Sequence, residues 1–243
     1  MQNIKVAATV KYMVRHLMMA NITDPLSASS RGQTPYELFF SGTGALGQIN
    51  YLDRKILTGG NFIVKVNGVT RTPVVDYVIN SSALTISWTA AYTPPSGNDN
   101  IQVNYEAVQS WIYDDHPFVN SNTYPRMTVS ILPLEYETPG MGVYQNYTAG
   151  PGNLVTATVK IIVRNRQGTQ QYTYGGIKYK NYDLIDAILT SVILYVNTNR
   201  QLRPWKFYDW EIKRDERVET EEDVGIFRGD VTIRLRYYDY SSP

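Results

Sequence analysis

The chain has 243 residues, in which 23 lysines and arginines stand against 22 aspartates and glutamates. The chain contains no cysteine, which excludes disulfides, thiol nucleophiles and cysteine-ligated metals. It contains only two histidines, His16 and His116, which argues against a multi-histidine metal site. A net charge of +1 argues against a surface that coats nucleic acid or an anionic membrane.

An amphipathic helix is predicted over residues 3–20, where apolar residues recur at helical spacing. Three basic residues interrupt this stretch, so it fits neither a signal peptide nor a membrane span. Asp24-Pro25 is expected to end the helix, and the Ser/Gly/Gln-rich residues 26–35 are expected to form a linker. The apolar residues of the predicted helix are Val6, Val10, Met13, Val14 and Leu17.

Residues 36–112 change to short β segments separated by turn residues. Apolar and polar residues alternate over 84–88 and 101–105, so each of these strands is expected to bury one face. Asn67-Gly68, after the strand predicted at 61–66, is typical of a two-residue hairpin turn. With a further strand at 76–80, the spacing indicates a small antiparallel sandwich or barrel.

The rest of the chain predicts an α/β pattern after a second linker at 113–123. Strands are expected at 127–135 and 155–164, then a helix over 182–196 capped by Asn181 or Asp183, then strands at 210–214 and 231–237. The predicted fold class is therefore α+β: a split α/β core (helix, β-β-α-β-β) from residues 1–25 plus 124–243, interrupted by the all-β insert 36–112. The apolar stripe of the second helix is Leu184, Ile185, Ile188, Leu189, Val192 and Val196.

No set of catalytic residues is evident. His116 follows Asp114 and Asp115, but neighbours in sequence do not orient an imidazole, and there is no Gly-x-Ser-x-Gly elbow. The glycines from Gly42 to Gly47 fit G-x-G-x-x-G without the parallel strand and helix that a dinucleotide site needs. We expect a packing or surface role for His16, no enzymatic activity, no cofactor and no metal.

The charged residues near the C-terminus are the candidate subunit interface. Residues 231–237 alternate apolar side chains with polar ones, so Arg234 and Arg236 are expected on one face of a strand, where they can pair with acidic residues of a neighbouring subunit. Tyr237, one of 20 tyrosines, ends this strand, and tyrosine suits surfaces buried on assembly. Residues 215–223 are expected to form an acidic hairpin that would also repel DNA; its acidic members are Asp215, Glu216, Glu219, Glu221, Glu222 and Asp223.

The order of these elements resembles the tail terminator family of tailed phages and related contractile systems. The segment that begins Pro125-Arg126-Met127 resembles the first strand of that family, Tyr182-Asp183-Leu184 begins a segment similar to its central helix, and residues 227–237 resemble its closing strand. The match covers residues 1–25 plus 124–243. The insert, with Val66-Asn67-Gly68 and a Pro-Pro loop at 94–99, resembles a β-module common in phage structural proteins.

This resemblance implies a structural virion protein of the neck, assembled in the host cytoplasm. Such a protein forms a homo-oligomer, a hexameric ring that caps the tail tube protein, stops its polymerisation and binds the head-completion or stopper protein; in a contractile tail it also meets the sheath protein. DNA passes through without specific binding, and no membrane is involved. The alternatives are another neck or baseplate adaptor, or a carbohydrate-binding module carried by the insert, which would require exposed aromatic residues, with Trp88, Tyr92 and Trp111 as candidates.

Overall fold

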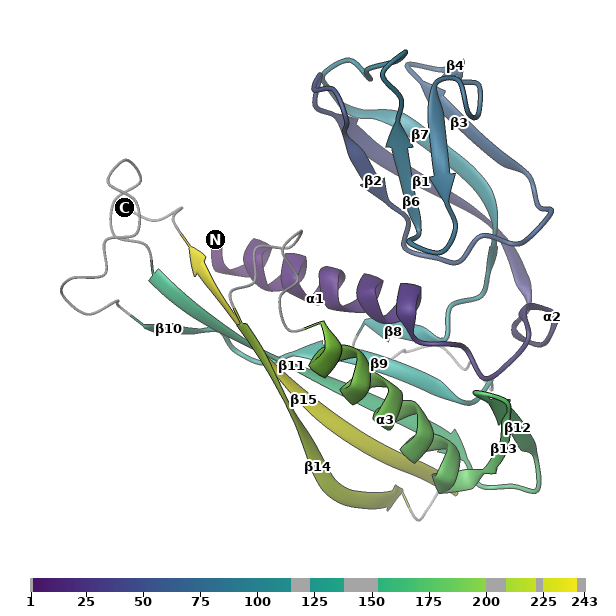
Figure 1. Ribbon diagram of the computed structural model, residues 1–243, viewed down its shortest axis with the longest axis vertical. Coiled ribbons are helices and arrows are strands. Elements are labelled where there is room, and N and C mark those ends of the chain that lie inside the picture. The colour runs from purple at the N-terminus through teal and green to yellow at the C-terminus, as the bar shows by residue number, and fades with distance from the viewer. Residues whose placement is uncertain (1, 115–122, 138–152, 200–208, 222–224, 240–243) are drawn as a thin grey trace. The chain divides into compact units, whose positions relative to one another are not determined.

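The computed structural model describes residues 2–114, 123–137, 153–199, 209–221 and 225–239 (Figure 1). Within these residues the chain is a mixed α+β protein. It divides into two compact units, residues 1–15 with 112–243, and residues 16–111. The division falls inside the first helix, α1 (Gln2–Asn21), whereas the sequence pattern placed the start of the insert at residue 36. Buried residues of α1 lie on both sides of the division: Val10 and Val14 before it, Leu17 and Met18 after it.

The larger unit is built on a six-stranded sheet. Its strand order is β14-β15-β11-β9-β8, with β10 beside β11, and every pair is antiparallel except β8 with β9. A strand is present at each predicted place in this region, and three strands are longer than the sequence pattern indicated. The strand predicted at 127–135 ends at Ile131, and a separate short strand begins at Glu135. The strands are β8 (Ile112–Asp114), β9 (Arg126–Ile131), β10 (Glu135–Glu137), β11 (Asn153–Arg166), β14 (Asp209–Glu221) and β15 (Ile226–Asp239).

Helix α3 (Asn181–Thr198) packs on one face of this sheet, against β11, β14 and β15 (Figure 1). All six residues of its predicted apolar stripe are buried, which confirms the helical spacing. The helix lies close to β15 at Gly229, where an added Cβ would stand 2.7 Å from Ile185 Cγ2 and 2.8 Å from Leu189 Cδ1. The odd-numbered residues of β15 from Gly229 to Leu235 therefore face α3, since side chains alternate along a strand.

The predicted cap of α3 is wrong, because the N-cap residue is Lys180 and makes no side-chain capping bond. Asn181 instead has a positive φ of 44°, and its Oδ1 accepts a hydrogen bond from the Gly168 N–H at 3.1 Å. Its side chain is thus used to hold the connection before the helix. That connection contains a hairpin that the sequence pattern missed, β12 (Gln171–Tyr174) and β13 (Ile177–Lys180), joined by two glycines.

Residues 16–111 form two antiparallel sheets that share an aromatic core. Asn67 and Gly68 both have positive φ, 51° and 78°, which confirms the predicted hairpin turn. One sheet has the order β1-β7-β3-β4 and the other β2-β6-β5. The strands are β1 (Gln33–Gly42), β2 (Ile49–Tyr51), β3 (Phe62–Val66), β4 (Val69–Thr70), β5 (Tyr77–Asn80), β6 (Thr85–Trp88) and β7 (Gly97–Val108).

The two segments predicted as linkers contain regular structure. Residues 26–35 hold a short helix, α2 (Ala28–Arg31), and the start of β1. Arg31 is buried and forms a two-point ion pair with Asp24, at 2.7 and 2.8 Å, which explains why this polar stretch is ordered. Of 113–123, the first two residues belong to β8, and residues 115–122 lie outside the described part of the chain.

Six aromatic rings follow one another through the core of the 16–111 unit, with neighbouring ring centroids 5.4–6.4 Å apart. An arginine lies over the ring at each end: Arg54 is 3.9 Å from the Tyr36 centroid and Arg71 is 4.1 Å from the Tyr92 centroid. The tyrosines of this series therefore pack in the core of the unit and do not form an assembly surface. In spatial order the rings are Tyr36, Tyr105, Phe62, Tyr77, Trp88 and Tyr92.

Candidate assembly interface

The candidate interface is the face of the six-stranded sheet opposite α3. Along β15, Val231, Ile233 and Leu235 are buried toward the helix, whereas Arg234 and Arg236 are exposed on the other face. This is the alternation that the sequence predicts. Among the described residues neither arginine has an ion-pair partner. Two cationic groups therefore share one face of a strand, although the register places Glu211 of β14, which is also exposed, opposite Arg234, and Asp209 opposite Arg236.

Further along the same face the charges are neutralised. Asp230 is 6% exposed and accepts hydrogen bonds from Arg228 at 2.9 and 2.7 Å, and Lys160 Nζ lies 2.8 Å from its Oδ2. Burial by itself raises the pKa of Asp230, but the bonds from Arg228 and Lys160 hold that pKa below its usual range. Beside the arginines, Lys213 of β14 stands opposite Thr232 in the register and is exposed. We call Lys213, Arg234 and Arg236 the basic stripe.

The acidic run does not form a loop as far as the structure describes it. Asp215, Glu216, Glu219 and Glu221 belong to β14, which pairs with β15 up to Glu221 and has a register irregularity between Asp215 and Glu219. The last two strands do pair as the predicted hairpin, but these acidic residues belong to its first strand, because backbone pairing with β15 continues beyond Arg214 up to Glu221. Glu222 and Asp223 lie outside the described residues, as do the side chains of Asp215, Glu216, Glu219 and Glu221 and of Tyr237, which pairs with Val155.

Sequence reasoning missed the polar groups on the helix side of the sheet. Tyr174 and Tyr179 of the β12–β13 hairpin and Asp183 and Asp186 of α3 line one groove. The hairpin carried a usable signal, because Gly175-Gly176 between two tyrosine-rich segments is a two-residue turn, and both glycines have positive φ. No sequence pattern could predict the groove itself, because the groove depends on how the hairpin lies against the helix.

The remaining candidates from the sequence carry no site. His16 is buried, and its two ring nitrogens each lie 3.0 Å from a backbone carbonyl oxygen, of Leu52 and of Ala83, as expected for a packing residue. His116 lies outside the described residues. In the described part of the chain there is no group of three or more metal-ligating side chains. No helix in that part has the length and apolarity to span a membrane.

The aromatic residues proposed for carbohydrate binding are not exposed as that proposal requires. Trp88 and Trp111 are 5% and 3% exposed, and the Trp88 Nε1–H donates to Asn50 Oδ1 at 2.8 Å inside the sandwich. Tyr92 is half-buried and lies under Arg71. Trp88 is buried because two apolar sheets must bury their facing sides against each other, and Trp111 lies under Arg31.

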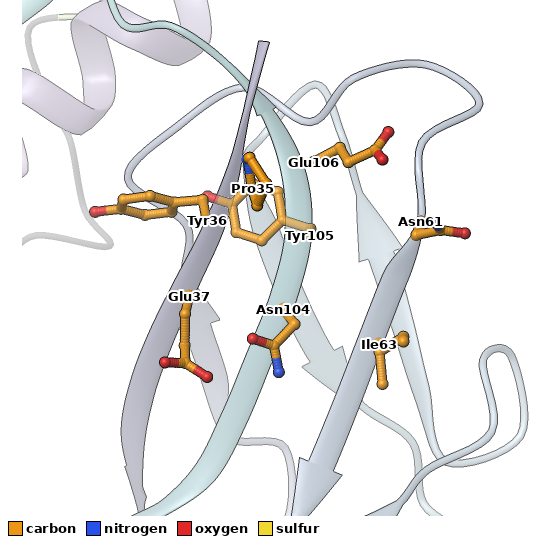
Figure 2. Close-up of a pocket in the computed structure, with 8 residues that line it drawn as sticks. All are labelled: Pro35, Tyr36, Glu37, Asn61, Ile63, Asn104, Tyr105 and Glu106. Carbon is orange, nitrogen blue, oxygen red and sulfur yellow. The ribbon is translucent and has the colours of Figure 1, made fainter.

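A hollow of about 350 Å³ with both polar and apolar lining lies instead on the outer side of the β1-β7-β3 sheet. Figure 2 shows Glu37, Asn104 and Ile63 side by side across three strands, which is also their pairing register. Glu106 and Asn61 extend the polar lining along the strands, and Glu37 accepts a hydrogen bond from Gln102 at 2.5 Å. The hollow thus combines carboxylates and amides with the apolar side chains of Pro35 and Ile63 and with two tyrosines, Tyr36 and Tyr105.

The comparisons with known proteins give no match to a family model and no match to a curated protein. The function must therefore be argued from the chemistry of these surfaces.

Proposed function

We propose that this chain is a structural, non-enzymatic protein of a tailed virus, and that it forms a ring at the head–tail junction. In this role the ring caps the tail tube, ends its polymerisation and presents a second surface to the head-completion protein. The observation that carries the proposal is the basic stripe, which leaves Arg234 and Arg236 exposed on a regular sheet face without ion-pair partners among the described residues. Arginine is enriched where protein surfaces associate.

The architecture of the larger unit supports the same role. Apart from the short strands β8 and β10 and the β12–β13 hairpin, its elements in chain order are β9, β11, α3, β14 and β15, and the first part of α1 belongs to the same unit. This is the order on which the resemblance to tail terminators rests. A ring with one face that matches a tube subunit and another that does not would end growth, because the next subunit finds no complementary surface.

The test is the assembly state of the full chain. We expect sedimentation velocity and negative-stain microscopy of the purified protein to give closed rings, and electron microscopy of particles to place them at the neck. A chain that stays monomeric at micromolar concentration, alone and with tube protein, would overturn the proposal. Density at the baseplate would assign it to the alternative adaptor role.

Glycan binding by the 16–111 unit is a second candidate, because the hollow in Figure 2 offers the groups that bind sugar hydroxyls. The carboxylates of Glu37 and Glu106 and the amides of Asn61 and Asn104 can each accept or donate to hydroxyls. We expect binding to neutral oligosaccharides on a glycan array that Asn104→Ala weakens and Ser87→Ala, on the other sheet, leaves unchanged. A blank array would remove this candidate.

A further inference from the structure

The groove on the helix side of the larger unit has a volume of about 580 Å³. The β12–β13 hairpin forms one wall and the solvent side of α3 forms the other, and the two elements are in contact. Beyond the groove, Ile177 of the hairpin is 58% exposed and Leu194 of the helix 66% exposed. The lining residues are Tyr174, Gly175, Tyr179, Asp183, Asp186, Ala187, Thr190 and Ser191.

The groove carries one uncompensated negative charge. Asp186 is already paired, because Arg214 of β14 donates to its carboxylate; this bond raises the pKa of Arg214. Asp183 is exposed and has no ion-pair partner within the residues that the structure describes. Tyr174 stays neutral at ordinary pH, since burial raises its pKa. Lys178 and Lys180 alternate with Tyr179 along β13, so they lie on the other face of the hairpin.

The chemistry of this groove suits a guanidinium group. The carboxylate of Asp183 can accept two parallel hydrogen bonds from an arginine, and the half-buried ring of Tyr179 offers a face on which the planar guanidinium can stack. Exposed Ile177 and Leu194 add apolar area that would be covered when a partner docks. A lysine ammonium could pair with the Asp183 carboxylate. It could not also stack as a plane on the Tyr179 ring and donate two parallel hydrogen bonds.

The matching cations are on the opposite face of the same unit. The basic stripe lies on the sheet face turned away from α3, whereas the groove lies on the helix side. One copy therefore cannot fill its own groove with its own stripe, but a second copy can. Two different complementary patches on opposite faces produce a head-to-tail contact, which generates a ring when the rotation closes.

We propose that the basic stripe of one copy docks in the groove of the next, with Arg234 or Arg236 placed between Tyr179 and Asp183. This inference rests on the proposed ring and names the surfaces that build it. It makes Asp183 and Tyr179 interface residues, and it leaves Asp186 a positioning residue that keeps α3 attached to β14 through Arg214.

Charge reversal and its rescue test this docking. Arg234→Asp with Arg236→Asp in one variant, and Asp183→Arg in another, should each weaken self-association tenfold or more in sedimentation velocity, because each leaves like charges facing each other. Joining all three substitutions should restore association, since the charges are then exchanged and not lost. The matched control is Arg166→Asp, an exposed charge ten residues along the pairing register from Arg236, which should associate like the wild type.

The outcomes separate the docking from the ring itself. If the arginine variant dissociates while Asp183→Arg assembles normally, the ring stands and the groove is not the docking site. Loss of rings in a Glu219→Lys, Glu221→Lys double variant would then show that the arginines bind the acidic run of a neighbouring copy. If neither variant changes association, the docking inference is wrong while the ring remains. A wild-type chain that never self-associates overturns the ring and the docking together. Circular dichroism of each variant verifies that these exposed substitutions leave the fold intact.

Discussion

Val74 has a positive φ of 68° and is 79% exposed, an unusual combination for a β-branched residue. The loop around it is closed by hydrogen bonds: the Val74 N–H donates to the Tyr77 carbonyl at 2.7 Å and the Thr72 N–H donates to Asp76 Oδ2 at 2.8 Å. The sequence contains no sign of this conformation, because it results from closing the loop between Thr72 and Tyr77.

We expect Val74→Gly to stabilise the 16–111 unit by about 1 kcal/mol, since glycine adopts positive φ without steric cost. Urea unfolding followed by the fluorescence of buried Trp88 and Trp111 measures the change. Val75→Gly is the matched control, because Val75 is also exposed but does not have a positive φ, and it should gain nothing. Equal unfolding midpoints for the two variants would contradict the assignment of strain to Val74.

Asp230 gives the larger unit an acid-sensitive contribution to stability. Its pKa in the folded state is lower than the value of about 3.9 in an unfolded chain, because Arg228 and Lys160 donate to its carboxylate. The contribution is therefore complete above about pH 4 and is lost as the pH falls through the folded pKa. Asp230→Asn should lower stability at pH 7 by about 1–3 kcal/mol and flatten the pH profile below pH 4.

The measurement is the free energy of unfolding in urea between pH 7 and pH 2. Asp183→Asn, which alters an exposed carboxylate without an ion-pair partner in the described residues, should follow the wild-type profile. Parallel acid profiles for wild type and Asp230→Asn would show that this carboxylate does not report on folding.

At the scale of elements, the sequence predicts helices and strands best where one face of the element is strongly apolar. All buried stripe residues of α3 could be predicted, because packing against a sheet requires the helical period. Strand β1 was not predicted as a strand: Tyr36, Leu38 and Phe40 are only half-buried, and the residues before them resemble a linker. The cap of α3 was wrong because Asn181 is used by the preceding loop, a tertiary contact that no local pattern contains.

Helix α3 also provides a matched pair of substitutions. Ile188→Asp places an unpaired charge at a fully buried position and should unfold the larger unit, at a cost of several kcal/mol. Leu194→Asp makes the same chemical change on the same helix at a position that is 66% exposed, and it should melt near the wild type. Circular dichroism melts decide: a native-like melt of Ile188→Asp would mean that α3 does not pack through this stripe.

At the scale of the whole molecule, the sequence predicted that Arg234 and Arg236 share an exposed strand face, but it did not predict the groove. Arg234 and Arg236 follow from alternation along one strand, which is a local property. The groove needs residues from β12, β13 and α3 together, and one wall is a hairpin that the pattern did not indicate. Single-sequence reasoning therefore identifies surfaces made by one element more readily than surfaces shared by several.

An interface centred on ionic contacts should depend on salt. We expect rings formed at about 0.05 M NaCl to dissociate substantially near 1 M, where the screening length falls to about 3 Å. Sedimentation velocity across this range measures the shift, with circular dichroism at each salt concentration as the control for folding. Rings that tolerate 1 M NaCl would point to an apolar interface elsewhere on the chain.

The division of α1 between two compact units has a consequence for insertions and deletions. A helix turns by about 100° per residue, so inserting or deleting a residue rotates all later side chains of the helix relative to the earlier ones. Gain or loss of one residue between Arg15 and His16 would turn Leu17 and Met18 out of line with Val10 and Val14, although all four are buried. The buried stripe of α1 therefore keeps its spacing only when the number of residues at this point of the helix is unchanged.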